Sequence, residues 1–242
     1  MHWYTKEGEP AYEIKGLSGK LRPTTLRDAK KLGLVPSVTT VMAILNKPAL
    51  ERWKIRKCIE KAYGLGHAVE GTDYKVWEVQ VLKEIDKEST DIMARGTEIH
   101  DTLEKWFKGE KVVGRSQLID SVIDAMPDDY KWIAEESFSH ESGYGGKVDL
   151  HSETAVLDFK TKAFTDVDQV SVYDEHAMQL AAYRKGLSIP DAPCYNLFIS
   201  TEVPGLVHLH KWKEEEIVRA ERMFFKCLEL WQLINKHDSS FK

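Results

Sequence analysis

The sequence contains few cysteines and no long apolar segment. Its 242 residues include three cysteines, Cys58, Cys194 and Cys227, which are odd in number and widely spaced. This pattern excludes a disulfide framework and a Cys-x-x-Cys metal site, so we expect reduced, buried thiols. No apolar run approaches the roughly 18 residues that a membrane span requires. The first residues mix acids and bases without a secretory segment, and we therefore expect a cytoplasmic protein that does not associate with membranes.

Internal repeats, low-complexity segments and clear linkers are also missing. With 42% hydrophobic and 30% charged residues, the composition is that of an ordinary globular chain. The net charge of −5 argues against a protein covered in nucleic-acid-binding charge. The charge is uneven, however, because residues 1–62 hold 13 Lys and Arg against 6 Asp and Glu. This asymmetry fits an anion-binding surface, and it fits scattered solvated charge equally well.

The spacing of apolar residues predicts a mainly helical first half and a mixed second half. Ser37 or Thr39 is suited to cap a short helix, and Pro48 to the first turn of the next one. Expected helices cover 48–63, 73–88, 91–108, 116–126, 172–187 and 214–236. Expected strands cover 131–140, 145–151, 155–161, 194–201 and 206–212. The predicted fold is mixed α/β, with a central mixed sheet flanked by helices.

The segment 145–162 carries two acids and a lysine in a predicted hairpin. If Glu153 and Thr154 form a two-residue turn, Asp149 lies opposite Asp158, with Cβ atoms about 4.5–5.5 Å apart. One face then holds the apolar residues Val148, Leu150, Leu157 and Phe159, and the other holds Asp149, Asp158 and Lys160. Because Glu-Thr is not a favoured turn pair, a longer loop with a different register stays open.

Opposed carboxylates in a strand pair require a compensating cation. A divalent metal such as Mg²⁺ or Mn²⁺ suits their oxygen ligands, and Lys160 is placed to orient a nearby water. This combination is typical of phosphodiester hydrolysis. The alternative is a half-exposed strand on which Asp158 and Lys160 form a surface ion pair.

Asp149 followed by Asp158-Phe159-Lys160 resembles the signature of PD-(D/E)XK nucleases, in the variant of the RecB-type exonucleases. Residues 95–104 resemble the family's Gly-x-x-x-His-x-x-Leu-Glu helix, which implies that His100 is a metal ligand. Gln179 and Tyr183 match the Gln-x-x-x-Tyr helix that organises the site and contacts DNA. On the first strand, Glu135-Glu136 resembles the family's preceding acid, for which we choose Glu136.

A looser similarity, over 36–41 and 47–53, is to phage-encoded and mitochondrial-type exonucleases of this superfamily. Val148 stands where the family's proline precedes the first acid, a departure that the family tolerates. The four cysteines of the iron–sulfur members are missing, so no iron–sulfur cluster is expected. The resemblance implies a PD-(D/E)XK core over 91–242, preceded by a basic, helical region over 1–90.

The implied activity is a metal-dependent DNA exonuclease acting from DNA ends in replication, recombination or repair. Asp149, Asp158 and His100, with Glu136 and the Phe159 carbonyl, would hold one or two Mg²⁺ or Mn²⁺ ions. Arg52, Arg56 and Lys57 are candidates for contacts with backbone phosphates. Expected partners are single-stranded or end-containing duplex DNA and, where the protein is phage-encoded and acts in the bacterial cytoplasm, an annealing or single-strand-binding protein. The alternatives are a structure-selective endonuclease or ribonuclease and a catalytically silent DNA-binding recombination scaffold, and the oligomeric state is open.

Overall fold

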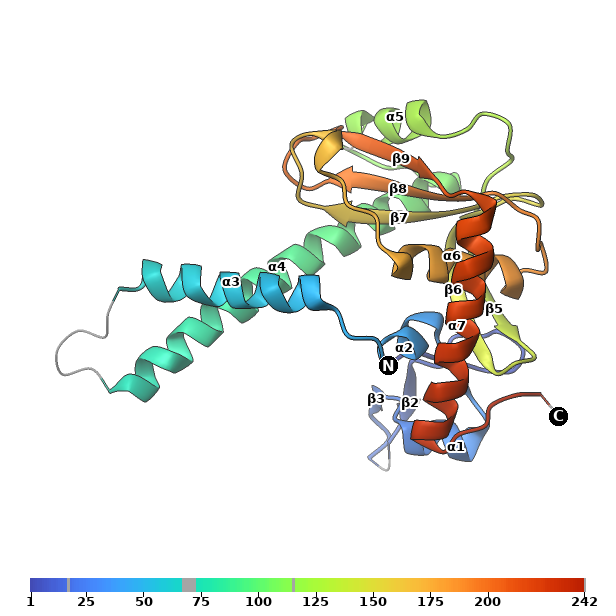
Figure 1. Cartoon of the computed structure of the whole chain (residues 1–242), viewed down its shortest axis with the longest axis horizontal. Helices are drawn as coiled ribbons and strands as arrows, with labels where there is room; N and C mark the ends of the chain where they lie inside the picture. The colour runs from blue at the N-terminus through green and yellow to red at the C-terminus, as the bar shows by residue number, and fades with distance from the viewer. Residues whose placement is uncertain (17, 67–72, 115, 242) are drawn as a thin grey trace. The chain divides into compact units, whose positions relative to one another are not determined.

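The protein is described by a computed structural model that covers residues 1–16, 18–66, 73–114 and 116–241 (Figure 1). The chain divides into two units. Residues 1–45 and 100–242 form the first, which we call the sheet unit, and residues 46–99 form the second, which we call the helical unit. Among the described residues, no helix is both long enough and apolar enough to cross a membrane.

A five-stranded sheet organises the sheet unit, with its strands in the order β5-β6-β7-β8-β9. The strands are β5 (Ile133–His140), β6 (Tyr144–His151), β7 (Val156–Lys162), β8 (Cys194–Ser200) and β9 (Val207–Lys211). β7 and β8 run parallel, whereas the other neighbours are antiparallel. Since parallel neighbours need a crossover, the chain between them passes through the 3₁₀ turn η1 (Val167–Gln169) and helix α6 (Asp174–Gly186). The predicted mixed α/β class is confirmed.

Helices complete the core on the sheet. Helix α6 contacts β5, β6, β7 and β8, and helix α7 (Glu214–Asn235) packs along α6 (Figure 1). Helix α5 (Ser116–Ala125) contacts the edge strand β9. Burying the apolar side chains of α6 and α7 stabilises this arrangement by about 25 cal/mol per Å² removed from water. One face of the sheet is therefore closed by α6, from which side chains reach β7.

The N-terminal 45 residues belong to the sheet unit and contain short strands. β1 (Trp3–Tyr4) pairs with β4 (Val35–Pro36), and β2 (Glu13–Lys15) pairs with β3 (Leu21–Pro23). The helices of this segment are α1 (Leu26–Leu32) and α2 (Val38–Met42), and Ser37, one of the two candidate caps, caps α2. Trp3 is fully buried, donates from Nε1 to the Thr24 carbonyl at 3.1 Å, and packs edge-on against Trp231 of α7. This packing ties the segment to α7.

The helical unit contains α3 (Pro48–Gly64) and the first part of α4 (Tyr74–Phe107). Pro48 begins α3, as its fixed φ predicts. Glu88 of α4 pairs with Lys57 at 3.0 Å and with Lys61 at 2.8 Å. α3 has no buried residue. Ion pairs and partly exposed contacts therefore join these two helices.

Two features differ from the sequence-based expectation. The helices predicted over 73–88 and 91–108 are one continuous helix, α4. Thr90 permits this because its hydroxyl donates to the Asp86 carbonyl one turn earlier, at 2.8 Å, instead of capping a new helix. The division of the chain also differs from the boundary expected at residue 90, because the N-terminal strands pack with the sheet and only residues 46–99 separate from it.

Candidate active site

Asp149 and Asp158 come together where β6 and β7 separate. Leu150 pairs with Leu157 and His151 with Val156, in the register that the two-residue turn predicts. Beyond these pairs, the Asp149 carboxylate accepts a hydrogen bond from the backbone N–H of Phe159 at 2.8 Å. Asp149 is thus held by the backbone of the strand that carries Asp158.

The apolar residues expected on one face of this hairpin, Val148, Leu150, Leu157 and Phe159, are all buried. They do not form a single surface, however. Val148 belongs to the core cluster that contains the α6 side chains. Phe159 instead lies against the rings of His100 and Phe107, at centroid distances of 6.0 and 6.3 Å. Val148 and Phe159 therefore have different surroundings, and the single apolar face that we expected is not observed.

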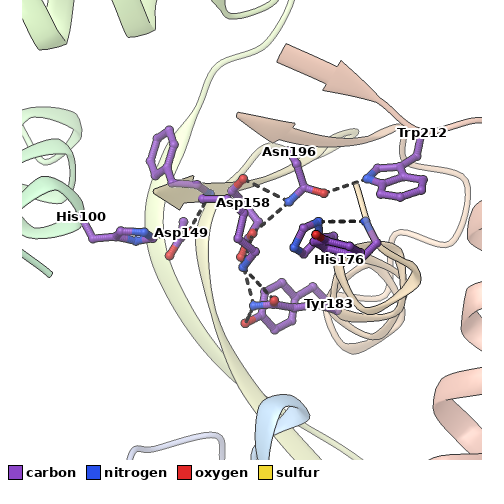
Figure 2. Close-up of polar contacts among 11 residues, drawn as sticks. His100, Asp149, Asp158, His176, Tyr183, Asn196 and Trp212 are labelled. Atoms are coloured by element: carbon purple, nitrogen blue, oxygen red, sulfur yellow. Dashed lines mark hydrogen bonds and ion pairs between the residues drawn. The ribbon is translucent and has the colours of Figure 1, made fainter. Parts of the chain in front are cut away.

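Asp158 is buried, with 3% of its surface exposed, and it is surrounded by donors (Figure 2). Lys160 Nζ lies 2.7 Å from Oδ2, and Gln179 Nε2 donates to Oδ1 at 3.0 Å. The Asn196 amide donates to Oδ2, also at 3.0 Å. Burial raises the pKa of Asp158 to about 6, with the Asp149 charge acting in the same direction and the Lys160 ammonium opposing it.

Gln179 connects helix α6 to the two charged residues of β7, Asp158 and Lys160. Its carbonyl accepts from Lys160 Nζ at 2.9 Å, and its amide nitrogen donates to both Asp158 and the Tyr183 hydroxyl, the latter at 2.7 Å. All three interactions use the full amide group, so the side-chain orientation is determined. Tyr183 lies one turn beyond Gln179, and burial raises the pKa of its phenol well above the ordinary value. The structure therefore brings the predicted residues Asp158, Lys160, Gln179 and Tyr183 into one network.

His100 reaches the other acid from α4. Its Nδ1 lies 3.5 Å from Asp149 Oδ2, and both residues belong to the sheet unit. Burial lowers the pKa of His100, but the hydrogen bond and charge of Asp149, with the charge of Asp158, outweigh it, so the net shift is upward. The Asp149 carboxylate thus favours the protonated form of the His100 imidazole.

The two glutamates at the start of β5 have different surroundings. Glu136, our choice from the sequence, is exposed at its side chain and pairs with His151 at 2.8 Å. Glu135 pairs with Lys147 and with Lys108, and it shares a hydrogen bond with Glu104, one turn beyond His100 on α4. Glu135 also has a left-handed φ of 50°, a conformation that stores roughly 1–3 kcal/mol in a residue other than glycine. The catalytic role of Glu136 stays a prediction, and Glu135 is the acid that lies beside the His100 helix.

The chemistry of the donor set fits a hard divalent ion. Carboxylates and one imidazole suit Mg²⁺ or Mn²⁺, and a carboxylate offers about four lone-pair sites, of which the three donors to Asp158 leave one. Among the described residues, no group of three His, Cys, Asp or Glu side chains is close enough to hold an ion as it stands. Binding of an ion would require His100, Asp149 and Asp158 to draw closer together. The Phe159 carbonyl stays a predicted ligand.

The basic residues predicted to contact DNA lie on α3, in the helical unit. Arg52 and Arg56 are exposed on this helix. Lys57 differs, since its ammonium pairs with Glu60 and Glu88 at 3.0 Å each, and these pairs raise its pKa. A phosphate would therefore compete with two carboxylates at Lys57, whereas Arg52 and Arg56 present their charge to solvent.

Asn196 and Trp212 were missed by the sequence analysis. Asn196 is fully buried on β8, beside Asp158, and it accepts a hydrogen bond from the Trp212 indole at 2.8 Å. A signal was available for Asn196, because it is the polar residue inside the apolar run Cys194–Ile199. Trp212 had no such signal, since a tryptophan at the end of a strand is equally typical of a core.

Comparison with known proteins finds distant similarities among solved structures. No protein-family description and no curated protein matches the chain. Among solved structures, it is similar to SSO0001, with 16% identity and a TM-score of 0.28 over 45% of this chain and 55% of that one. It is also similar to a "Putative exonuclease" from Eubacterium rectale, with 10% identity and a TM-score of 0.43 over 79% of this chain and 87% of that one. The chain thus spans about half the length of SSO0001, and likenesses this distant support no argument about activity.

Proposed function

We propose that this protein is a metal-dependent deoxyribonuclease that hydrolyses phosphodiester bonds from DNA ends. The observation that carries the proposal is the closed set of hydrogen bonds among Asp158, Lys160 and Gln179 beside the Asp149–His100 pair. The order of these residues along the chain, and the helices and strands that hold them, agree with the resemblance to the PD-(D/E)XK nucleases. A surface ion pair between Asp158 and Lys160 is a poor description, because Asp158 is buried.

Each residue of the site has a separate proposed role. Asp149, Asp158 and His100 would hold the Mg²⁺ or Mn²⁺ ion, with Glu136 and the Phe159 carbonyl as further predicted ligands. A bound ion would lower the pKa of a water molecule and neutralise charge on the scissile phosphate. Lys160 carries a fixed positive charge at the same place, and a preoriented donor of this kind stabilises negative charge that develops in the transition state. Gln179 holds Lys160 and Asp158 at the same time and so sets the distance between ammonium and carboxylate.

The proposal also specifies that cleavage starts at DNA ends. No helix-turn-helix or zinc finger is recognisable in the sequence, and such modules are a common basis of sequence-specific cutting. The proposed partner is accordingly DNA with a free end, single- or double-stranded, in recombination, repair or replication. An annealing or single-strand-binding protein is a proposed second partner.

The test is digestion of 5′- and 3′-labelled linear DNA and of closed circular DNA, with Mg²⁺ or Mn²⁺. We expect loss of linear DNA only. Lys160→Ala should lower the rate by roughly 100- to 1,000-fold, as expected for loss of one preoriented electrostatic group. Asp158→Ala should abolish cleavage while the circular dichroism spectrum stays that of the wild type.

Lys226→Ala is the matched control, because it removes the same charge from an exposed position on α7, where Lys226 pairs with Glu229. It should cleave at the wild-type rate. Cutting of circles would favour an endonuclease, and cleavage of RNA alone would favour a ribonuclease. Tight DNA binding without cleavage would indicate a silent scaffold. A fully active Lys160→Ala would contradict the proposed roles.

A further inference from the structure

Asn196 is a polar side chain in the middle of a buried strand. All seven residues of β8 are buried, and Asn196 has no exposed surface. A buried amide costs about 1–3 kcal/mol when it lacks partners, and an apolar residue at this position would avoid that risk. The reason for an asparagine therefore lies in what its amide contacts.

The amide connects Asp158 to Trp212. Asn196 is the direct partner of Asp158 in the parallel register of β7 and β8, so the two side chains lie on the same face of neighbouring strands. Its nitrogen donates to Asp158 Oδ2 at 3.0 Å and lies 3.3 Å from the Asp158 carbonyl. Its oxygen accepts from Trp212 Nε1 at 2.8 Å, and Figure 2 shows the three side chains in line.

The partners also determine which way the amide points. An indole N–H is only a donor, so the oxygen of Asn196 must face Trp212 and the NH₂ group must face Asp158. If the amide turned over, two N–H groups would meet at Trp212 and two oxygens would meet at Asp158. Trp212 therefore ensures that Asn196 presents a donor to the carboxylate.

We propose that Asn196 and Trp212 are positioning residues for Asp158, which hold its carboxylate in place while Lys160 and Gln179 act on the substrate. This inference rests on the proposed function, because it treats Asp158 as a residue of the reaction centre. Of the three donors to Asp158, Lys160 is the one that would also face a phosphate, and Gln179 is bonded to Lys160. Asn196 lies on the neighbouring strand β8, and its hydrogen bond to Asp158 involves neither Lys160 nor Gln179.

The first test uses the metal-free protein and needs no activity. The side-chain N–H resonances of Asn196 and Trp212 are recorded by ¹H–¹⁵N NMR and assigned from Asn196→Ala and Trp212→Phe. In Asn196→Ala, the Trp212 indole proton should exchange with solvent faster and change its chemical shift. In Asp158→Ala, the Asn196 amide resonances should shift. Unchanged resonances in both variants would overturn the proposal.

The second test is steady-state cleavage of labelled linear DNA. Loss of a group that orients a ligand or catalytic residue typically lowers activity by about 10- to 100-fold. We expect a loss of this size in kcat for Asn196→Ala, a smaller loss for Trp212→Phe, and an unchanged KM for DNA in both. Trp212→Phe keeps an aromatic ring in the core, so it provides the answer if Asn196→Ala does not fold.

Tyr195→Phe is the matched control. It removes the hydroxyl of the adjacent β8 residue, whose recorded partner is the Tyr130 hydroxyl at 3.3 Å, away from Asp158. If Asn196 and Trp212 only stabilise the fold, Asn196→Ala and Trp212→Phe should resemble Tyr195→Phe, with a lower melting temperature and an unchanged kcat. This outcome would overturn the proposal. If the wild type cleaves no DNA, the proposed function fails, while the NMR test still decides whether Trp212 and Asn196 hold Asp158.

Discussion

The sheet unit and the helical unit bury very different amounts of apolar surface. In the sheet unit, α6 and α7 close over a sheet whose strand β8 is buried throughout. In the described part of the helical unit, residues 46–66 and 73–99, Val81 is the buried large hydrophobic residue. Several apolar side chains there are instead exposed: Leu50, Ile55, Ile59, Tyr63, Tyr74, Val76, Val79, Leu82 and Met93.

This contrast indicates which unit can hold catalytic side chains in a defined orientation. A reaction centre requires side chains whose orientation is held by packing and by a second layer of hydrogen bonds. Asp158 has both, because it is buried and receives donors from β7, β8 and α6. Arg52 and Arg56 on α3 have exposed surroundings, which suit contacts with a phosphate backbone but not a reaction centre.

The largest effect that separates the two units is on stability. Leu180→Ala removes a fully buried side chain of α6 and should lower the free energy of unfolding by about 2–5 kcal/mol. Ile59→Ala on α3, where the side chain is 64% exposed, should change it by about 0.5 kcal/mol or less. Urea denaturation followed by circular dichroism measures both. Equal losses would show that Ile59 is covered in solution.

The next effect is on DNA affinity. Replacing Arg52 and Arg56 together with glutamine should weaken DNA binding and leave kcat unchanged, because the residues of the proposed reaction centre belong to the other unit. The plot of log affinity against log salt concentration should become less steep. The absolute value of its slope should decrease by about 1.4–1.8, as expected for two lost phosphate contacts. Fluorescence anisotropy with labelled DNA at several salt concentrations measures this slope. The double variant Lys30→Gln with Lys31→Gln is the control, because it removes two exposed charges from α1. An unchanged slope in the α3 variant would show that Arg52 and Arg56 do not contact DNA.

The smallest effect concerns the ion pairs between α3 and α4. Lys61 and Lys57 lower the pKa of Glu88. A depressed folded-state pKa means that these pairs stabilise the helical unit above the ordinary glutamate pKa and lose their effect as the pH falls through the folded value. Glu88→Gln should therefore be slightly less stable than the wild type at pH 7, by about 0.5 kcal/mol, and this difference should be smaller at pH 3.

Amide hydrogen exchange of α3 and α4 at the two pH values measures this difference. Glu84→Gln, an exposed change on the same helix, serves as the charge-matched control. The interpretation would be wrong if Glu88→Gln and Glu84→Gln had the same effect at pH 7, or if the effect of Glu88→Gln were larger at pH 3.

The sequence by itself determined the class of the fold and most of the proposed reaction centre. Periodicity placed α5, α6, α7 and the five strands, because one face of each helix and strand must be apolar to be buried. The register of Leu150 with Leu157 followed from a short turn. His100, Asp149, Asp158, Lys160 and Gln179 stand in an order along the chain that resembles a known nuclease signature, so the resemblance predicted them as site residues before their positions in space were known.

Only the tertiary structure decided which groups hold these residues. Asn196 is 38 residues beyond Asp158 and meets it through the parallel pairing of β7 with β8, a contact that no local pattern contains. The left-handed Glu135 and the continuous helix α4 likewise depend on local backbone geometry that apolar spacing does not report. Spacing along the chain records which face of an element is apolar, whereas the partners of a buried polar group are decided by which elements pack together.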